Sequence, residues 1–241
     1  MDKHNKFRFQ FKYFGINDSE CAMKIGTDGV LLGAWADVKF SHNILDIGSG
    51  SGLISLMLAQ QSNANITGIE IDENAVKQSI DNINNSHWKN RITIIHDDFT
   101  QWATNLDKYI KFDHIVSNPP FFNNGPIAPS NTRATARHEK SLGYDQLIKL
   151  SIQLLTKDGK LSIISPYNRK DDIIFLCELS QLYISRITNI YSKEDGKPVR
   201  ILWEIRKLKC RSKHTSFAIR DKDNLYTNEY INLTKDFYLN F

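Results

Sequence analysis

Short apolar runs alternate with longer mixed runs over most of the chain. The apolar runs, at residues 43–47, 66–71, 92–96, 112–117 and 160–165, predict buried strands. The intervening stretches 53–61, 73–84, 144–155 and 169–180 predict helices. This βαβ alternation requires crossover helices on both faces of a mostly parallel sheet, so we expect an α/β, doubly wound fold.

The pattern changes after residue 180. Two strand-like runs, 183–191 and 200–208, are joined by a segment that contains Gly196 and Pro198, which predicts an antiparallel hairpin. A parallel sheet that ends in such a hairpin is typical of the class I methyltransferase (Rossmann-like) fold. We therefore expect a single domain built on a seven-stranded, mostly parallel sheet, with a catalytic core at 41–208 and a C-terminal tail at 209–241.

Length and composition favour one soluble domain. The 241 residues are 41% hydrophobic, enough for one well-buried core. No apolar run approaches the roughly eighteen residues of a membrane span, and no apolar signal segment opens the chain. The three cysteines form no Cys-x-x-Cys pair. We expect a cytoplasmic protein without a metal, a membrane association or an obligate protein partner.

Positive charge gathers near the end of the chain. Residues 181–241 hold 12 lysines and arginines against 7 aspartates and glutamates. A surface that binds a polyanion needs this kind of surplus, although a solvated face looks the same in sequence.

A glycine-rich turn follows the first predicted strand. Asp46, Gly48, Gly50 and Gly52 form a D-x-G-x-G-x-G pattern in which the third glycine comes one residue earlier than in dinucleotide-binding folds. The pattern resembles the first motif of class I methyltransferases. The resemblance implies S-adenosylmethionine as cofactor and S-adenosylhomocysteine as product, with an acidic group suited to the cofactor ammonium.

Two further acids follow the next two strands. Glu70 closes the second strand, where a carboxylate can accept hydrogen bonds from both ribose hydroxyls. Asp98 follows the third strand, and the resemblance implies that it binds the adenine amino group. Each acid taken singly could instead be a helix N-cap, as could Asp72. Their recurrence beside the glycine turn favours a nucleoside-type cofactor.

The fourth strand ends in Asn118, Pro119, Pro120 and Phe121. Two prolines cannot continue a central strand, so the chain must turn out at the carboxyl edge of the sheet. The Asn118 side-chain oxygen and free backbone carbonyls can accept from a planar amino group. This tetrad resembles the Asn-Pro-Pro-aromatic motif of amino-group methyltransferases, in which the acceptors localise the nitrogen lone pair and the aromatic ring stacks on a flipped base.

The tetrad does not select a substrate, so the flanking sequence must. Residues 21–35 and 226–239 resemble the family of bacterial tRNA1(Val) adenine methyltransferases, and the resemblance spans nearly the whole chain. It implies methyl transfer to N6 of the adenine at tRNA nucleotide 37, beside the anticodon. It also implies that residues 1–40 pack over the cofactor, with Lys24 and Thr27 as cofactor contacts.

Several basic residues are candidate RNA contacts, with solvated surface runs as the competing interpretation. They lie in the long stretch after the tetrad and just after the predicted hairpin. They are Arg133, Arg137, Arg206, Lys207, Lys209, Arg211 and Lys213.

Three alternatives stay open at this point. Enzymes with closely similar tetrads methylate the side-chain amide nitrogen of protein glutamine or the amino group of DNA adenine. A non-enzymatic nucleotide-binding module is the third alternative, and the intact tetrad argues against it.

Overall fold

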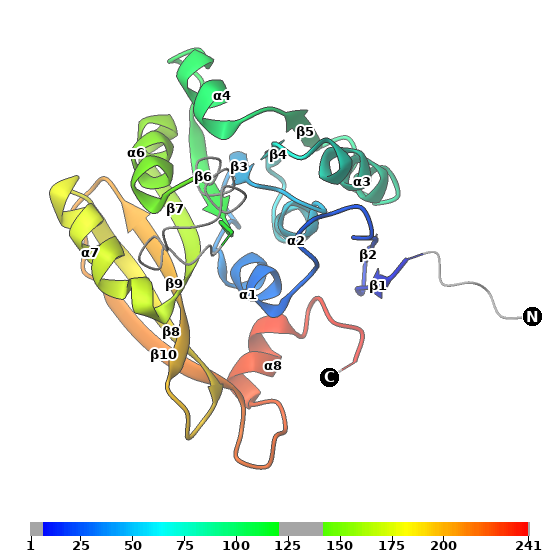
Figure 1. Ribbon diagram of the computed structural model, residues 1–241, viewed down its shortest axis with the longest axis vertical. Coiled ribbons are helices and arrows are strands. Elements are labelled where there is room, and N and C mark those ends of the chain that lie inside the picture. The colour runs from blue at the N-terminus through cyan, green and yellow to red at the C-terminus, as the bar shows by residue number, and fades with distance from the viewer. Residues whose placement is uncertain (1–6, 121–141, 241) are drawn as a thin grey trace, which may run out of the picture.

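One eight-stranded sheet organises the protein. The computed structural model describes residues 7–120 and 142–240, and its strands are ordered β10-β8-β9-β7-β6-β3-β4-β5 (Figure 1). All neighbouring pairs are parallel except the two that β9 makes, with β7 and with β8. The predicted doubly wound, mostly parallel α/β class with a C-terminal antiparallel hairpin is confirmed.

The strands agree closely with the hydrophobic runs. A separate two-stranded ribbon, β1 and β2, lies near the N-terminus. The strand bounds are β1 Phe9–Gln10, β2 Gly15–Ile16, β3 Asn43–Ile47, β4 Asn65–Glu70, β5 Ile92–His96, β6 Phe112–Ser117, β7 Leu155–Pro166, β8 Tyr183–Lys193, β9 Pro198–Arg206 and β10 Lys213–Arg220. The predicted count of seven strands was too low, because β10 extends the sheet from within the segment expected to be a tail.

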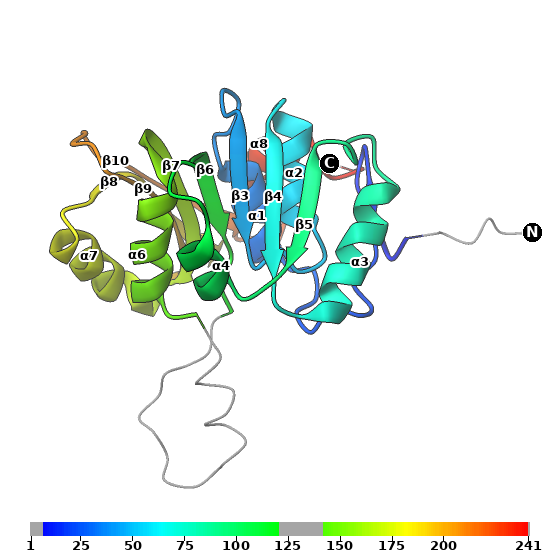
Figure 2. The same cartoon turned by 90° about the horizontal axis from the view of Figure 1, so that it is seen from above.

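Helices cover both faces of the sheet (Figure 2). The buried side chains of α1, α2, α3 and α8 belong to one hydrophobic cluster, and those of α4, α6 and α7 to the other. The helix bounds are α1 Thr27–Trp35, α2 Leu53–Gln61, α3 Glu73–Asn84, α4 Phe99–Asn105, α6 Tyr144–Leu154, α7 Lys170–Leu179 and α8 Asn228–Thr234, with a 3-10 turn η1 at Tyr167–Arg169. The sequence patterns did not predict α1, α4 or α8.

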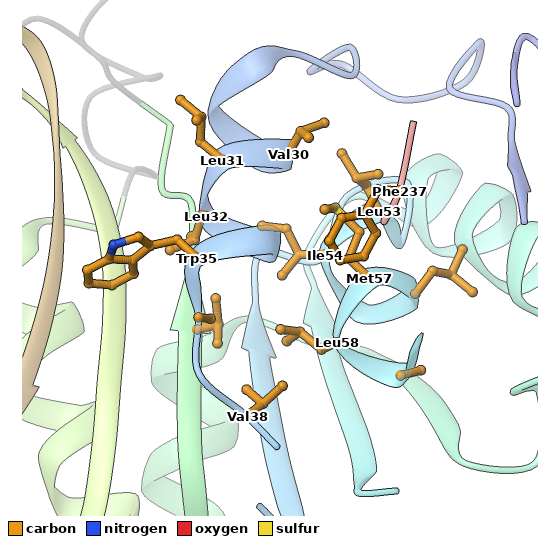
Figure 3. Packing of buried hydrophobic residues seen from close by; sticks show 14 of the residues in the cluster. Val30, Leu31, Leu32, Trp35, Val38, Leu53, Ile54, Met57, Leu58 and Phe237 are labelled. Atoms are coloured by element: carbon orange, nitrogen blue, oxygen red, sulfur yellow. The ribbon is translucent and has the colours of Figure 1, made fainter. Parts of the chain in front are cut away.

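Helix α1 escaped prediction because it is buried on nearly all sides. Figure 3 shows Val30 on the side turned toward Ile54 and Met57 of α2, whereas Trp35 points the other way. A side chain on Gly33 would meet the Met57 sulfur at 2.7 Å, so glycine there lets the two helices approach closely. Each fully buried aliphatic side chain stabilises such packing by about 1.5–3 kcal/mol.

Trp35 joins the C-terminal end of α1 to strand β8. Its indole Nε1 donates a hydrogen bond to Thr188 Oγ1 at 2.9 Å, and the Arg186 guanidinium lies 3.6 Å from the ring centroid. Both partners lie on β8. Helix α1 therefore bridges α2 and the C-terminal half of the sheet, which fixes its N-terminus over the carboxyl edge of the strands.

The two ends of the described chain also pack together. Phe11 stacks on Phe14 at 4.8 Å and on Tyr238 at 5.8 Å between ring centroids. No helix in the described residues is long and apolar enough to cross a membrane.

Candidate active site

The carboxyl ends of β3, β4 and β6 meet at one place on the sheet edge. The Ser117 hydroxyl at the end of β6 donates to the Ile47 carbonyl at the end of β3, at 2.9 Å. The amides of Gly48 and Ser49 donate to the Ile69 carbonyl of β4 at 2.9 and 3.1 Å. These bonds hold the glycine turn beside Asn118, which directly follows Ser117.

The glycine turn has the shape of a ligand cradle. Gly48, Gly50 and Gly52 have φ of +71°, +52° and +81°, a region that side-chain-bearing residues rarely adopt. A Cβ on Gly48 or Gly50 would meet no atom of the described residues within 4 Å. The backbone of the turn therefore faces open space, which allows a ligand to approach it closely.

Asp46 lies fully buried beneath this turn. One carboxylate oxygen accepts a hydrogen bond from Ser55 Oγ at 2.7 Å, and the other has no partner among the described residues. Burial raises the pKa of Asp46 to about 6, against the lowering effect of the Ser55 bond. A buried, half-satisfied carboxylate of this kind is suited to an incoming cation.

Glu70 is bonded to the same turn. Its Oε2 accepts from the Gly50 amide at 2.8 Å and its Oε1 accepts from the Asp72 amide at 2.9 Å. Each carboxylate oxygen has a second lone-pair site, so both retain capacity for ribose hydroxyls. Glu70 thus shapes the cradle and remains able to contact a ligand in it.

Asp98 forms an N-cap. Its Oδ1 accepts from the Thr100 amide at 2.8 Å, from the Gln101 amide at 3.1 Å, and from the Thr100 hydroxyl. Burial raises the pKa of Asp98, but these bonds outweigh it and hold the pKa below its ordinary value. Asp72 caps α3 in the same way. The structure therefore places one Asp98 oxygen in helix capping, and its contact with the cofactor adenine stays a prediction.

The N-terminal segment reaches the glycine turn through α3. Asn82 donates to the carbonyls of Asn17 and Ser51 at 2.7 and 2.9 Å, and it accepts from the Asn17 amide at 2.9 Å. Ser51 belongs to the turn, so one buried amide joins the turn to the segment. Sequence reasoning missed Asn82 because nothing in its local pattern distinguishes it from a surface asparagine.

Lys24 and Thr27, predicted as cofactor contacts, have other surroundings. The Lys24 ammonium donates to the carbonyls of Asp18, Ser19 and Cys21 at 2.8, 2.8 and 2.9 Å and so stabilises its own loop. Thr27 lines a groove between α1 and the β8–β9–β10 part of the sheet. Both roles toward the cofactor remain predictions.

The side chain of Asn118 presents a buried hydrogen-bond acceptor directly after β6. Its Oδ1 is buried and has no hydrogen-bond partner among the described residues. Its Nδ2 lies 3.9 Å from where a Cβ on Gly29 would be, so α1 closes over it. Pro119 is buried and Pro120 is exposed. Phe121, Arg133 and Arg137 lie outside the described residues.

The structure does not bring the basic run, residues 206–213, to this edge of the sheet. Because β9 is antiparallel to β7, its last residue Arg206 pairs with Lys160, at the opposite edge from Asn118. Arg206 is ion-paired with Glu204 at 3.2 Å, and Lys207 donates to the Leu155 carbonyl at 2.6 Å. Lys209 and Arg211 are exposed, and Lys213, also exposed, begins β10 at that same edge.

Together these groups fit a zwitterionic nucleoside cofactor. The open glycine cradle, the orphan Asp46 oxygen and the remaining lone pairs of Glu70 suit a backbone contact, an ammonium and a ribose. Within the described part of the chain, no three His, Cys, Asp or Glu side chains are grouped to hold a metal ion.

Comparison with known proteins agrees with this geometry. The model of the methyltransferase small domain family matches residues 22–183. A tRNA1(Val) (adenine(37)-N6)-methyltransferase of Bacteroides fragilis is 40% identical over 96% of this chain and 97% of its own length. The chain belongs to this methyltransferase family. A protein of the same name from Haemophilus influenzae is 42% identical over 97% of this chain and 99% of its own length.

Solved structures of methyltransferases share the fold. A protein of Agrobacterium tumefaciens, described as a predicted O-methyltransferase, aligns with a TM-score of 0.68 at 19% identity, covering 87% of this chain and 96% of its own. A ribosomal protein L11 methylase of Lactobacillus delbrueckii aligns with a TM-score of 0.51 at 17% identity, covering 75% and 77%. At these identities the likeness concerns the fold alone.

Proposed function

We propose that this protein transfers a methyl group from S-adenosylmethionine to N6 of an adenine in tRNA, at nucleotide 37 beside the anticodon of tRNA1(Val). The observation that carries the proposal is the buried Oδ1 of Asn118, which has no partner among residues 7–120 and 142–240 and lies next to the open glycine cradle. The names of relatives at 40–42% identity over nearly full length support the substrate.

One group of residues would bind the cofactor, and Asn118 would bind the amino group of the substrate. S-adenosylmethionine supplies an electrophilic methyl group on a positively charged sulfur. In the proposal, Asp46 accepts from its ammonium, Glu70 holds its ribose, and the amides around Gly48 and Gly50 lie against it. This fixes the side of Asn118 from which the methyl group is presented.

Asn118 acts on the amino group to be methylated. Its Oδ1 accepts one amino hydrogen, and the Pro119 peptide, which has no N–H, leaves neighbouring carbonyls free to accept the other. These two acceptors pull the nitrogen toward tetrahedral geometry and direct its lone pair to the methyl group. The new N–C bond would form as the S–CH3 bond breaks, which releases S-adenosylhomocysteine, and the nitrogen would then lose a proton to water.

The test is a parallel transfer of labelled methyl to unmodified total tRNA, total protein and duplex DNA. Label on tRNA, recovered after digestion as N6-methyladenosine, supports the proposal. Label on protein glutamine or on DNA adenine would overturn the substrate and retain the catalytic groups. The same assay is run with Asn118→Ala, which should lose transfer. Asn43→Ala is its matched control, because Asn43 begins β3 at the far edge of the sheet.

A further inference from the structure

A groove opens farther along the same sheet edge, beyond Asn118 on the side away from the glycine turn. It has a volume of about 410 Å³ and lies between the first turn of α1 and strands β8, β9 and β10. Binding sites for small molecules span about 300–1,000 Å³, so the groove is large enough for one nucleoside. The functions assigned above to Asn118, Asp46 and Glu70 leave it without a role.

The groove has an apolar floor and half-buried apolar walls. Leu31 and Ile190 are fully buried at its base, and Val199 and Ile219 line it with part of their surface exposed. Apolar side chains such as these can pack against the face of a nucleobase.

Polar groups border the same groove. Arg200 Nε donates to Asp28 Oδ2 at 2.9 Å, and both side chains are about one-third or less exposed, at 32% and 25%. Ser192 of β8 is exposed and adds a hydroxyl. The guanidinium can bind a phosphate, and the carboxylate and hydroxyl can bind the edge of a base.

The position of the groove relates it to the reacting base. Asp28 is adjacent to Gly29, the residue of α1 that lies against Asn118. Along the sheet edge the order is glycine turn, Asn118, then Arg200, because β9 lies two strands beyond β6. Two strand spacings are about 10 Å, so a nucleotide next to a flipped target reaches the groove.

We infer that this groove binds the nucleotide adjacent to the target adenosine and so contributes to RNA selection. The inference rests on the proposed function and deepens it. Recognition of single-stranded RNA commonly uses splayed bases bound in separate pockets. The groove would hold the neighbouring base between Val199 and Ile219, with Arg200 turned toward its phosphate.

The test combines a filled groove with an RNA that lacks the neighbouring base. Ser192→Trp fills the groove from an exposed position, and Ser192→Leu is a milder second variant. Glu194→Trp places the same ring on the hairpin outside the groove. Each protein receives an anticodon stem-loop RNA that is intact or carries an abasic nucleotide on one side of the target.

We expect the abasic change on one side of the target to raise the wild-type KM by about tenfold or more. Ser192→Trp should raise KM for intact RNA by a similar factor and be insensitive to that abasic change. Glu194→Trp should behave as wild type, and cofactor affinity, measured by calorimetry, should be the same in all variants.

Two results would overturn the inference while leaving the proposed function intact. One is a wild-type KM that is indifferent to both abasic changes. The other is a KM of wild-type size in both folded Ser192 variants. If the wild-type protein transfers no methyl group to the intact RNA, the proposed function fails and the inference fails with it.

Discussion

The hydroxyl of Ser117 donates a hydrogen bond to the carbonyl of Ile47 at 2.9 Å, which joins the ends of the two strands that carry the active-site turns. Both residues are almost completely buried, so the bond lies in a medium that excludes water. It fixes Asn118, the next residue, relative to Gly48.

Ser117→Ala should therefore impair catalysis more than folding. Leaving the Ile47 carbonyl unsatisfied should cost about 1–3 kcal/mol of unfolding free energy. We expect a kcat about tenfold lower with cofactor affinity nearly unchanged, because the misplaced group is Asn118. Ser162→Ala removes another buried hydroxyl, bonded to His114, in the middle of the sheet and should lower stability alone. Equal kcat values for the two variants would refute this account.

Cofactor binding should depend on pH through Asp46. Burial raises the pKa of Asp46 to about 6, and the charge of Glu70 adds a smaller increase. The carboxylate that would accept from an ammonium is therefore lost as the pH falls through about 6. Calorimetric titration with S-adenosylmethionine between about pH 5 and 8 should show weaker binding at the acid end. Asp46→Asn should bind weakly throughout and lose this dependence; an unchanged pH profile in that variant would contradict the assignment.

Buried His114 should make the free energy of unfolding depend on pH, with a sign opposite to that of the Asp46 contribution. Burial lowers the pKa of His114 from 6.5 to about 3, so the folded protein keeps this imidazole neutral. The unfolded chain takes up a proton first as the pH falls, so this contribution to stability is complete above pH 6.5 and is lost below it. Asp46, whose pKa is raised, opposes the trend below about pH 6.

The difference between wild type and His114→Gln isolates the histidine. Urea unfolding should show wild type losing about 2 kcal/mol more than the variant between pH 6.5 and about pH 5. Parallel pH profiles for the two proteins would show that His114 does not titrate in this way.

The basic run at the far edge should matter only for a large RNA. Arg206 lies six positions after Arg200 along β9, which is about 20 Å. We expect Lys209→Gln/Arg211→Gln to leave methylation of an isolated anticodon stem-loop unchanged. Binding of full-length tRNA should weaken, and the slope of its salt dependence should fall by about one for each phosphate that is no longer neutralised.

Lys77→Gln/Lys89→Gln removes the same charge elsewhere and is the control. Both lysines are exposed, one on α3 and one just after it. If the two double variants have equal salt slopes on full-length tRNA, the run does not contact RNA.

Local signals predicted the turns at the strand ends better than the elements around them. The glycine turn and the Asn118 tetrad depend on short-range backbone chemistry, so their positions at strand ends followed from sequence. Helix α1 was missed because a helix buried on nearly all sides lacks the period of an amphipathic one. Strand β10 was missed because it is a mostly exposed edge strand with few apolar residues.

The position of the basic run was predictable in part. The hairpin was expected, and an antiparallel strand must end at the edge opposite to its parallel neighbours. The antiparallel direction of β9 alone separates Arg206 from Asn118. The capping role of Asp98 was recognised as an alternative, but sequence could not choose between cap and ligand because both require a carboxylate at a strand end.

The most direct test of the central claim is the single-turnover rate of methyl transfer by Asn118→Ala to unmodified tRNA. The wild-type protein and Asn43→Ala provide the references, and cofactor binding is checked by calorimetry. We predict retained cofactor affinity and a rate at least about 100-fold lower, because the acceptor for the amino group is removed. A rate within a few fold of wild type would contradict this prediction.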